Sequence, residues 1–112
     1  MPRSEKEVVN ILREIYRAEF AGKRDQRFLI SWADLREIYG YQSLYQTRFD
    51  TLVEEAGRRG AYLFDLGQTE VGRLVAVVPR RTVHRWRRVP RKVIEQYRLP
   101  VDDDGDEYSE EC

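Results

Sequence analysis

Basic side chains that could neutralise phosphate groups are concentrated between residues 78 and 92, in the segment VPRRTVHRWRRVPRK. The segment holds seven basic residues, one tryptophan, the only histidine of the chain and no acid. Arginine and lysine neutralise nucleic-acid phosphates, and aromatic rings stack on exposed bases. The predicted phosphate contacts are Arg80, Arg81, Arg85, Arg87, Arg88, Arg91 and Lys92, and the predicted stacking side chains are Trp86 and His84. The alternative is a solvated ribbon in which Trp86 only covers an edge of the core.

The formal net charge of zero hides two blocks of opposite sign. Residues 80–98 carry eight basic residues and one acid, whereas residues 101–112 carry seven acids and no base. Such blocks are typical of interaction surfaces and tails. We expect residues 101–112 to form a disordered acidic tail. Three roles stay open for it: a solubilising end, an internal competitor that folds back on the basic segment, or a feature that a basic partner binds.

Residues that could carry catalysis or hold a metal are scarce. His84 and Cys112 are the only histidine and the only cysteine, so no cluster with metal-ligand spacing can be assembled. The sequence contains no GxxxxGK[ST] phosphate loop, and its acids lie on a helix face or in the expected tail. We therefore expect no catalytic residue, no metal, no cofactor and no enzymatic activity.

The length and hydropathy of the chain favour one cytoplasmic domain. Its 112 residues are close to the common size of a single domain. No apolar run approaches the roughly 18 residues of a membrane span. The N-terminal MPRSEKEVV lacks the apolar region of a signal peptide.

The elements that must position the basic segment begin with a helix over residues 5–20, whose apolar residues recur at intervals of three and four. Ser4 and Glu7 have the spacing of a capping box, and Gly22 is expected to end the helix. Residues 27–31 predict a short strand. A short helix over 32–39 follows, with Ser31 as its N-cap and Gly40 after its last turn.

A longer helix is predicted over residues 44–57, opened by a second capping box formed by Ser43 and Gln46. Its expected buried stripe is Tyr45, Phe49, Leu52, Val53 and Ala56. The strand-like runs 61–66 and 73–78 flank the loop GQTEVG and predict a β-hairpin. At Pro79 we expect the ladder either to end or to become a sheet edge.

Residues 82–89 fit either an extended arm or one helical turn capped by Thr82. After them, Pro90 is expected at the first position of a last helix. The inner face of that helix would carry Val93, Ile94 and Tyr97.

This order of helix, short strand, two helices and β-hairpin resembles the winged helix-turn-helix family. The resemblance implies an α+β winged-helix core over residues 1–79, followed by a basic arm with a short helix over 80–100 and the tail over 101–112. It makes 32–39 the first helix of the helix-turn-helix, 44–57 the recognition helix and 67–72 the wing tip. In that family the start of the recognition helix reaches base edges. The matching positions are Gln46, Thr47 and Arg48 for bases and Ser43 for the phosphate backbone.

Two features depart from a DNA-reading winged helix. The predicted recognition helix carries Asp50, Glu54 and Glu55, and the predicted wing carries Glu70. We expect a non-enzymatic DNA-binding protein, a transcriptional regulator or a mobile-element accessory factor, with double-stranded DNA as its partner. The alternative is a winged-helix protein-interaction module, or an inhibitor or adaptor of a nucleoprotein complex. A homodimer stays open, and no membrane partner is expected.

Overall fold

A computed structural model describes residues 1–100 of the chain. Over these residues the order of elements is α1 (Glu5–Arg17), β1 (Phe28–Ser31), α2 (Trp32–Tyr39), α3 (Gln46–Arg58), β2 (Ala61–Thr69), β3 (Gly72–Pro79), α4 (Arg80–Val83) and α5 (Arg91–Glu95). The predicted α+β class is confirmed, and the predicted disordered tail lies outside the described residues.

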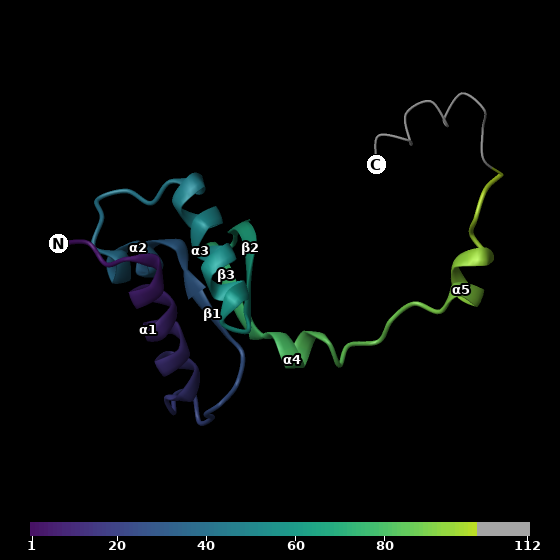
Figure 1. The fold of residues 1–112 in the computed structure, drawn as a ribbon, viewed down its shortest axis with the longest axis horizontal. Coiled ribbons are helices and arrows are strands. Elements are labelled where there is room, and N and C mark those ends of the chain that lie inside the picture. The colour runs from purple at the N-terminus through teal and green to yellow at the C-terminus, as the bar shows by residue number, and fades with distance from the viewer. Residues whose placement is uncertain (101–112) are drawn as a thin grey trace.

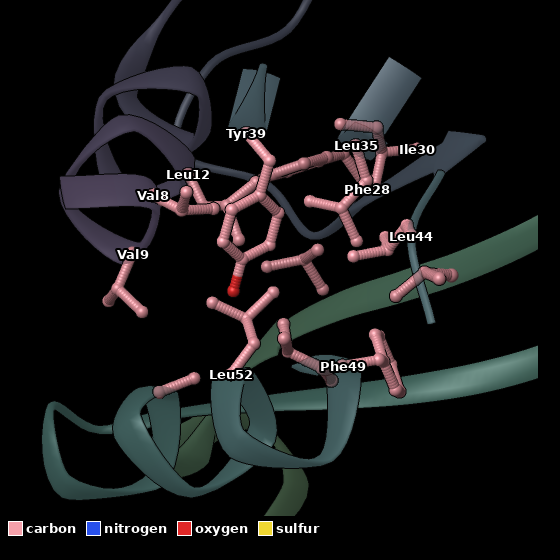
Figure 2. Packing of buried hydrophobic residues seen from close by; sticks show 14 residues of the cluster. Val8, Val9, Leu12, Phe28, Ile30, Leu35, Tyr39, Leu44, Phe49 and Leu52 are labelled. Atoms are coloured by element: carbon pink, nitrogen blue, oxygen red, sulfur yellow. The ribbon is translucent and has the colours of Figure 1, made fainter. Parts of the chain in front are cut away.

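The three strands form one antiparallel sheet in the order β1-β3-β2. Alternate side chains of the sheet point towards the helices, as the two-residue period of a strand requires. Phe28 and Ile30 of β1, Val75 and Val77 of β3, and Leu63 of β2 are buried there. They meet apolar residues of α1, α2 and α3 in one core, part of which is shown in Figure 2. The opposite face of the sheet keeps Leu29, Phe64 and Leu66 exposed.

The start of α1 is confirmed, and its predicted end is wrong. The Ser4 hydroxyl accepts from the Glu7 amide at 3.2 Å while Glu7 accepts from the Ser4 amide at 2.9 Å. The helix stops at Arg17, three residues before the predicted end, because the chain then turns back. Phe20 pairs with Lys23 in an isolated bridge and packs edge-on against Phe28. Gly22 lies in this turn at φ +77° instead of at the end of the helix.

The short helix α2 has its predicted bounds and both predicted caps. Ser31 Oγ accepts from the Asp34 amide at 3.0 Å, and Gly40 adopts φ +91°, which costs glycine little. Leu35 and Tyr39 of this helix are fully buried, and Tyr39 supplies a large part of the core (Figure 2).

The predicted start of the longer helix is wrong. α3 begins at Gln46, and its N-cap is Tyr45, whose side chain makes no capping hydrogen bond. The residues before it stay out of the helix because Leu44 is buried in the core and its carbonyl accepts from Trp32 Nε1 at 3.2 Å. Tyr45, predicted in the buried stripe, is 71% exposed, whereas Phe49, Leu52 and Ala56 are buried as predicted.

The β-hairpin is confirmed, with longer strands than predicted. Thr69 pairs with Gly72, so the turn consists of Glu70 and Val71 and most of the predicted loop 67–72 belongs to the strands. A register shift between Asp65 and Gly67 marks an irregularity around Leu66. The ladder ends at Pro79, which pairs with Ala61.

The segment after β3 departs from two predictions. One helical turn forms at Arg80–Val83 with Pro79 as its N-cap, so Thr82 is inside the turn and does not cap it. Pro90 is the N-cap of α5, not its first residue. Val93, Ile94 and Tyr97 are all exposed, so α5 has no inner face; it stands away from the body of the domain (Figure 1).

Candidate nucleic-acid interface

The start of α3, predicted to read bases, is engaged within the protein. Gln46 Nε2 donates to Asp50 Oδ1 at 3.0 Å, and Gln46 Oε1 accepts from Arg73 Nη2 at 2.9 Å. Arg48 donates to Glu5 Oε2 at 2.9 Å, and its guanidinium lies 4.5 Å from the centroid of the Tyr41 ring. Thr47 is exposed. Gln46 and Arg48 would therefore have to leave internal partners before they could bond a base.

The β2–β3 hairpin adds little free positive charge next to the start of α3. Arg73 Nη2 bonds Asp65 Oδ2 at 2.6 Å, and its guanidinium lies 3.5 Å from the centroid of the Trp32 ring. The hydrogen bond from Arg73, assisted by the Gly67 amide, holds the pKa of Asp65 below its ordinary value. The same pair raises the pKa of Arg73, so both groups stay ionised as an internal ion pair.

The first two arginines of the basic segment attach it to the domain. The Arg80 amide donates to the Gly60 carbonyl at 2.8 Å, and the Arg80 guanidinium donates to the Gly57 carbonyl. Arg81 Nη2 donates to the hydroxyl of Tyr16 at 3.2 Å. These contacts fix where the segment leaves the body of the domain.

His84 and Trp86, the predicted stacking residues, differ in their surroundings. His84 Nε2 lies 3.1 Å from the Tyr62 hydroxyl, and its ring is tilted against that of Tyr62. Trp86 is 55% exposed and borders an apolar hollow of about 820 Å³ on the outer face of the sheet. Both side chains are exposed, so each keeps ring surface that a base could stack on.

Beyond His84 every described residue is exposed. The cations here, called the basic arm below, are Arg85, Arg87, Arg88, Arg91 and Lys92. Over residues 1–100 the arm makes one ion pair, between Arg91 Nε and Glu95 Oε2 at 3.6 Å. Ser43, the predicted backbone contact before α3, is exposed, and it does not form the predicted capping box with Gln46 because the N-cap is Tyr45.

A second group of arginines joins Arg81, a predicted phosphate contact, to three arginines that the sequence did not indicate. Arg13 and Arg17 of α1, Arg59 after α3 and Arg81 of α4 all line one hollow of about 500 Å³. The only local signal was the four-residue spacing of Arg13 and Arg17, which places them on the same helix face. Arg59 is distant in sequence, and only the packing of α1 against α3 brings it to this hollow.

Comparison with known proteins returned nothing: no protein-family model, no curated protein and no solved structure matches the chain. Within residues 1–100, no three side chains of histidine, cysteine, aspartate or glutamate gather where they could bind a metal ion. None of the described helices has the length and apolar character needed to cross a membrane.

Proposed function

We propose that the chain is a non-enzymatic DNA-binding protein with a winged helix-turn-helix fold, acting as a transcriptional regulator or as an accessory factor of a mobile element. The order α1-β1-α2-α3-β2-β3 supports the fold, and so does the position of β3 between β1 and β2. In this proposal α2 and α3 form the helix-turn-helix, and the β2–β3 hairpin is the wing.

The observation that carries the proposal is the basic arm. Its five cations are exposed and share one ion pair within the described residues, so most of their charge is available to a polyanion. The contacts of Arg80 and Arg81 with the domain hold the start of the arm in place. Each phosphate that the arm neutralises releases counterions, which favours binding at low salt.

The proposal makes phosphate contacts the main source of affinity. Gln46 and Arg48 already have internal partners, and Asp50 and Glu54 are exposed further along α3. An acidic helix surface repels the phosphate backbone, so base readout by Gln46, Thr47 and Arg48 would add preference among sequences more than affinity. Loss of Gln46 or Arg48 should then alter sequence preference, whereas loss of arm cations should weaken binding to all sequences alike.

The test is a salt titration of binding to duplex DNA, for the wild type and for the double variant Arg85→Gln, Arg87→Gln. If both side chains contact phosphates, the variant binds more weakly and the slope of log K against log salt falls by about two. A matched control is Arg3→Gln with Lys6→Gln, which removes the same charge from Arg3 before α1 and from Lys6 in its first turn. The control should keep the wild-type salt slope. Identical binding of all three proteins would refute the proposal.

A second candidate function is protein binding on the same fold. The apolar hollow on the outer face of the sheet, bordered by Leu29, Phe64, Leu66 and Trp86, supports it because exposed apolar patches mark interaction sites. The acidic surface of α3 supports it too. The variant Asp50→Lys, Glu54→Lys separates the two functions: it should strengthen DNA binding if α3 approaches DNA, and should break partner binding if α3 docks a basic protein.

A further inference from the structure

The hollow lined by Arg13, Arg17, Arg59 and Arg81 lies apart from the basic arm and from the start of α3. It is formed where the second half of α1 meets the end of α3, the beginning of β2 and the turn α4. Its volume of about 500 Å³ falls within the range of small-molecule sites, roughly 300–1,000 Å³. A ligand of that size would meet side chains from four elements at once.

Two of the four arginines are held in place by the protein. Arg59 donates to Glu55 Oε2 at 2.9 Å and to Asn10 Oδ1 at 3.3 Å, and its side chain is 26% exposed. Arg81 donates to the Tyr16 hydroxyl at 3.2 Å. A guanidinium has five N–H donors, so each of these arginines retains donors for a ligand.

The other two arginines carry uncompensated charge. Within residues 1–100, neither Arg13 nor Arg17 makes an ion pair or a side-chain hydrogen bond, and both are exposed. Asp25 is the single acid among the residues that line the hollow. The hollow therefore has an excess of positive charge that favours an anion.

The rest of the lining is apolar or aromatic. Val9, Leu12, Ala56 and Leu63, all buried residues of the core, reach the hollow from α1, α3 and β2. An inorganic anion would leave this surface in contact with water. A ligand that joins a phosphate to a flat ring would cover the apolar surface with the ring and offer its oxygens to the arginines, which bind phosphate in a bidentate manner.

We propose that this hollow binds a nucleoside phosphate, either a free nucleotide or one nucleotide of a strand. The phosphate lies between Arg13 and Arg17 and is bonded by the remaining donors of Arg59 and Arg81. The ring lies against the apolar lining. This site uses none of the arm cations, so it does not depend on the proposed contact of the arm with duplex DNA.

The test is calorimetric titration of the full chain with AMP, with adenosine and with inorganic phosphate. AMP should bind at least about tenfold more tightly than adenosine or inorganic phosphate, because each of these makes only part of the contacts.

The variant Arg13→Gln, Arg17→Gln should weaken AMP binding about tenfold or more. Its melting temperature should match that of the wild type, since neither side chain has a partner within residues 1–100. Unchanged AMP affinity in this variant, or no heat from AMP at millimolar concentration, would overturn the proposal.

The arm variant Arg85→Gln, Arg87→Gln is the matched control, and it should bind AMP as the wild type does. The same variant distinguishes the proposed DNA binding from the proposed nucleotide site. It should lose binding to duplex DNA if the arm contacts phosphates, and it should still bind AMP if the hollow is a separate site. A short oligothymidine, titrated in the arm-variant background with and without Arg13→Gln and Arg17→Gln, identifies the source of the ligand. Tighter binding of the oligothymidine than of AMP, lost with the two arginines, indicates a strand; tighter binding of AMP indicates a free nucleotide.

Discussion

Tyr39 carries a polar hydroxyl into the core, where it has a single charged partner among the described residues. The residue is fully buried among the apolar side chains of the core (Figure 2). Its hydroxyl donates to Glu5 Oε2 at 3.1 Å. Glu5 Oε2 also accepts from Arg48 at 2.9 Å, so one carboxylate links α1, α2 and α3. Burial, and then the charge of Glu5, raise the pKa of Tyr39 far above its usual value of 10.0.

This raised pKa predicts a loss of stability in alkali. Above about pH 10 an unfolded tyrosine ionises while Tyr39 in the folded protein stays protonated, so the unfolded state holds fewer protons. The free energy of unfolding should then fall with rising pH, by up to about 1.4 kcal/mol per pH unit from this group. Urea unfolding between pH 8 and pH 11 measures the slope.

The variant Tyr39→Phe supplies the comparison for that slope. It should be less stable near neutral pH by about 1 kcal/mol, since one hydrogen bond is lost, and should lose less stability above pH 10. Tyr97→Phe, which changes a 75% exposed tyrosine, should follow the wild-type curve. Parallel curves for the wild type and Tyr39→Phe would show that Tyr39 does not cause the alkaline loss.

Among the elements, α3 combines a well-packed body with a weak start. Phe49, Leu52 and Ala56 are buried, whereas the N-cap Tyr45 is largely exposed and supplies no side-chain acceptor. Its backbone, at φ −88° and ψ 154°, already has the extended conformation that an N-cap serine adopts.

Because Tyr45 supplies no acceptor to the first turn of α3, a side chain that can accept there should stabilise the helix relative to one that cannot. Tyr45→Ser should make the protein more stable than Tyr45→Ala by about 1 kcal/mol, because only serine can accept a hydrogen bond from the first turn. The alanine variant controls for removal of the tyrosine ring. Chemical unfolding of the two proteins measures the difference, and equal midpoints would mean that the first turn gains nothing from a side-chain acceptor.

Elements were predictable from the sequence where their hydrogen bonds join near neighbours. Ser4 with Glu7, and Ser31 with Asp34, form the caps that their spacing indicates. The start of α3 was not predictable in this way, because the bond from Trp32 to the Leu44 carbonyl holds the chain before it out of the helix. The predicted inner face of α5 is wrong for a different reason. The spacing of apolar residues shows which side of a helix could be buried, but not whether another part of the protein packs against that side.

The candidate sites also differ in whether their residues are near neighbours in the sequence. The basic arm is continuous in sequence, so composition alone was enough to find it. The arginine-lined hollow joins Arg13, Arg59 and Arg81, which only the packed helices bring together. Gln46 bonds Asp50 four residues along α3, but its other partner, Arg73, is distant in sequence, and so is Glu5, the partner of Arg48. No local pattern indicated these two distant partners.

On the scale of the whole molecule, the described chain has two parts, a packed domain up to α4 and an exposed basic segment after it. Up to α4 the chain belongs to one core, and α4 itself packs against β3. Beyond His84 the described chain is exposed and leaves the domain (Figure 1). The folded body and the basic arm should therefore respond differently to truncation.

A chain ending at Val89 should have the same free energy of unfolding as the full chain, within about 0.5 kcal/mol, since changes away from packed features have small effects. A chain ending at Pro79 should be less stable, because it loses the bonds from Arg80 to Gly60 and Gly57 and from Arg81 to Tyr16. Urea unfolding of the full chain and of the two truncated chains measures these differences in the free energy of unfolding. A marked loss of stability on truncation at Val89 would show that α5 contributes to the fold.

The central position of β3 has a consequence for the timing of synthesis. Phe28 of β1 pairs with Val77 of β3, and β2 pairs only with β3, so β1 has no partner strand until the hairpin has been made. During translation α1, β1 and α2 therefore emerge long before the sheet can close, with Phe28 and Ile30 still uncovered. We expect the domain to fold in one late step, after β3 has left the ribosome, and a chaperone that shields apolar segments to act on the chain before that step.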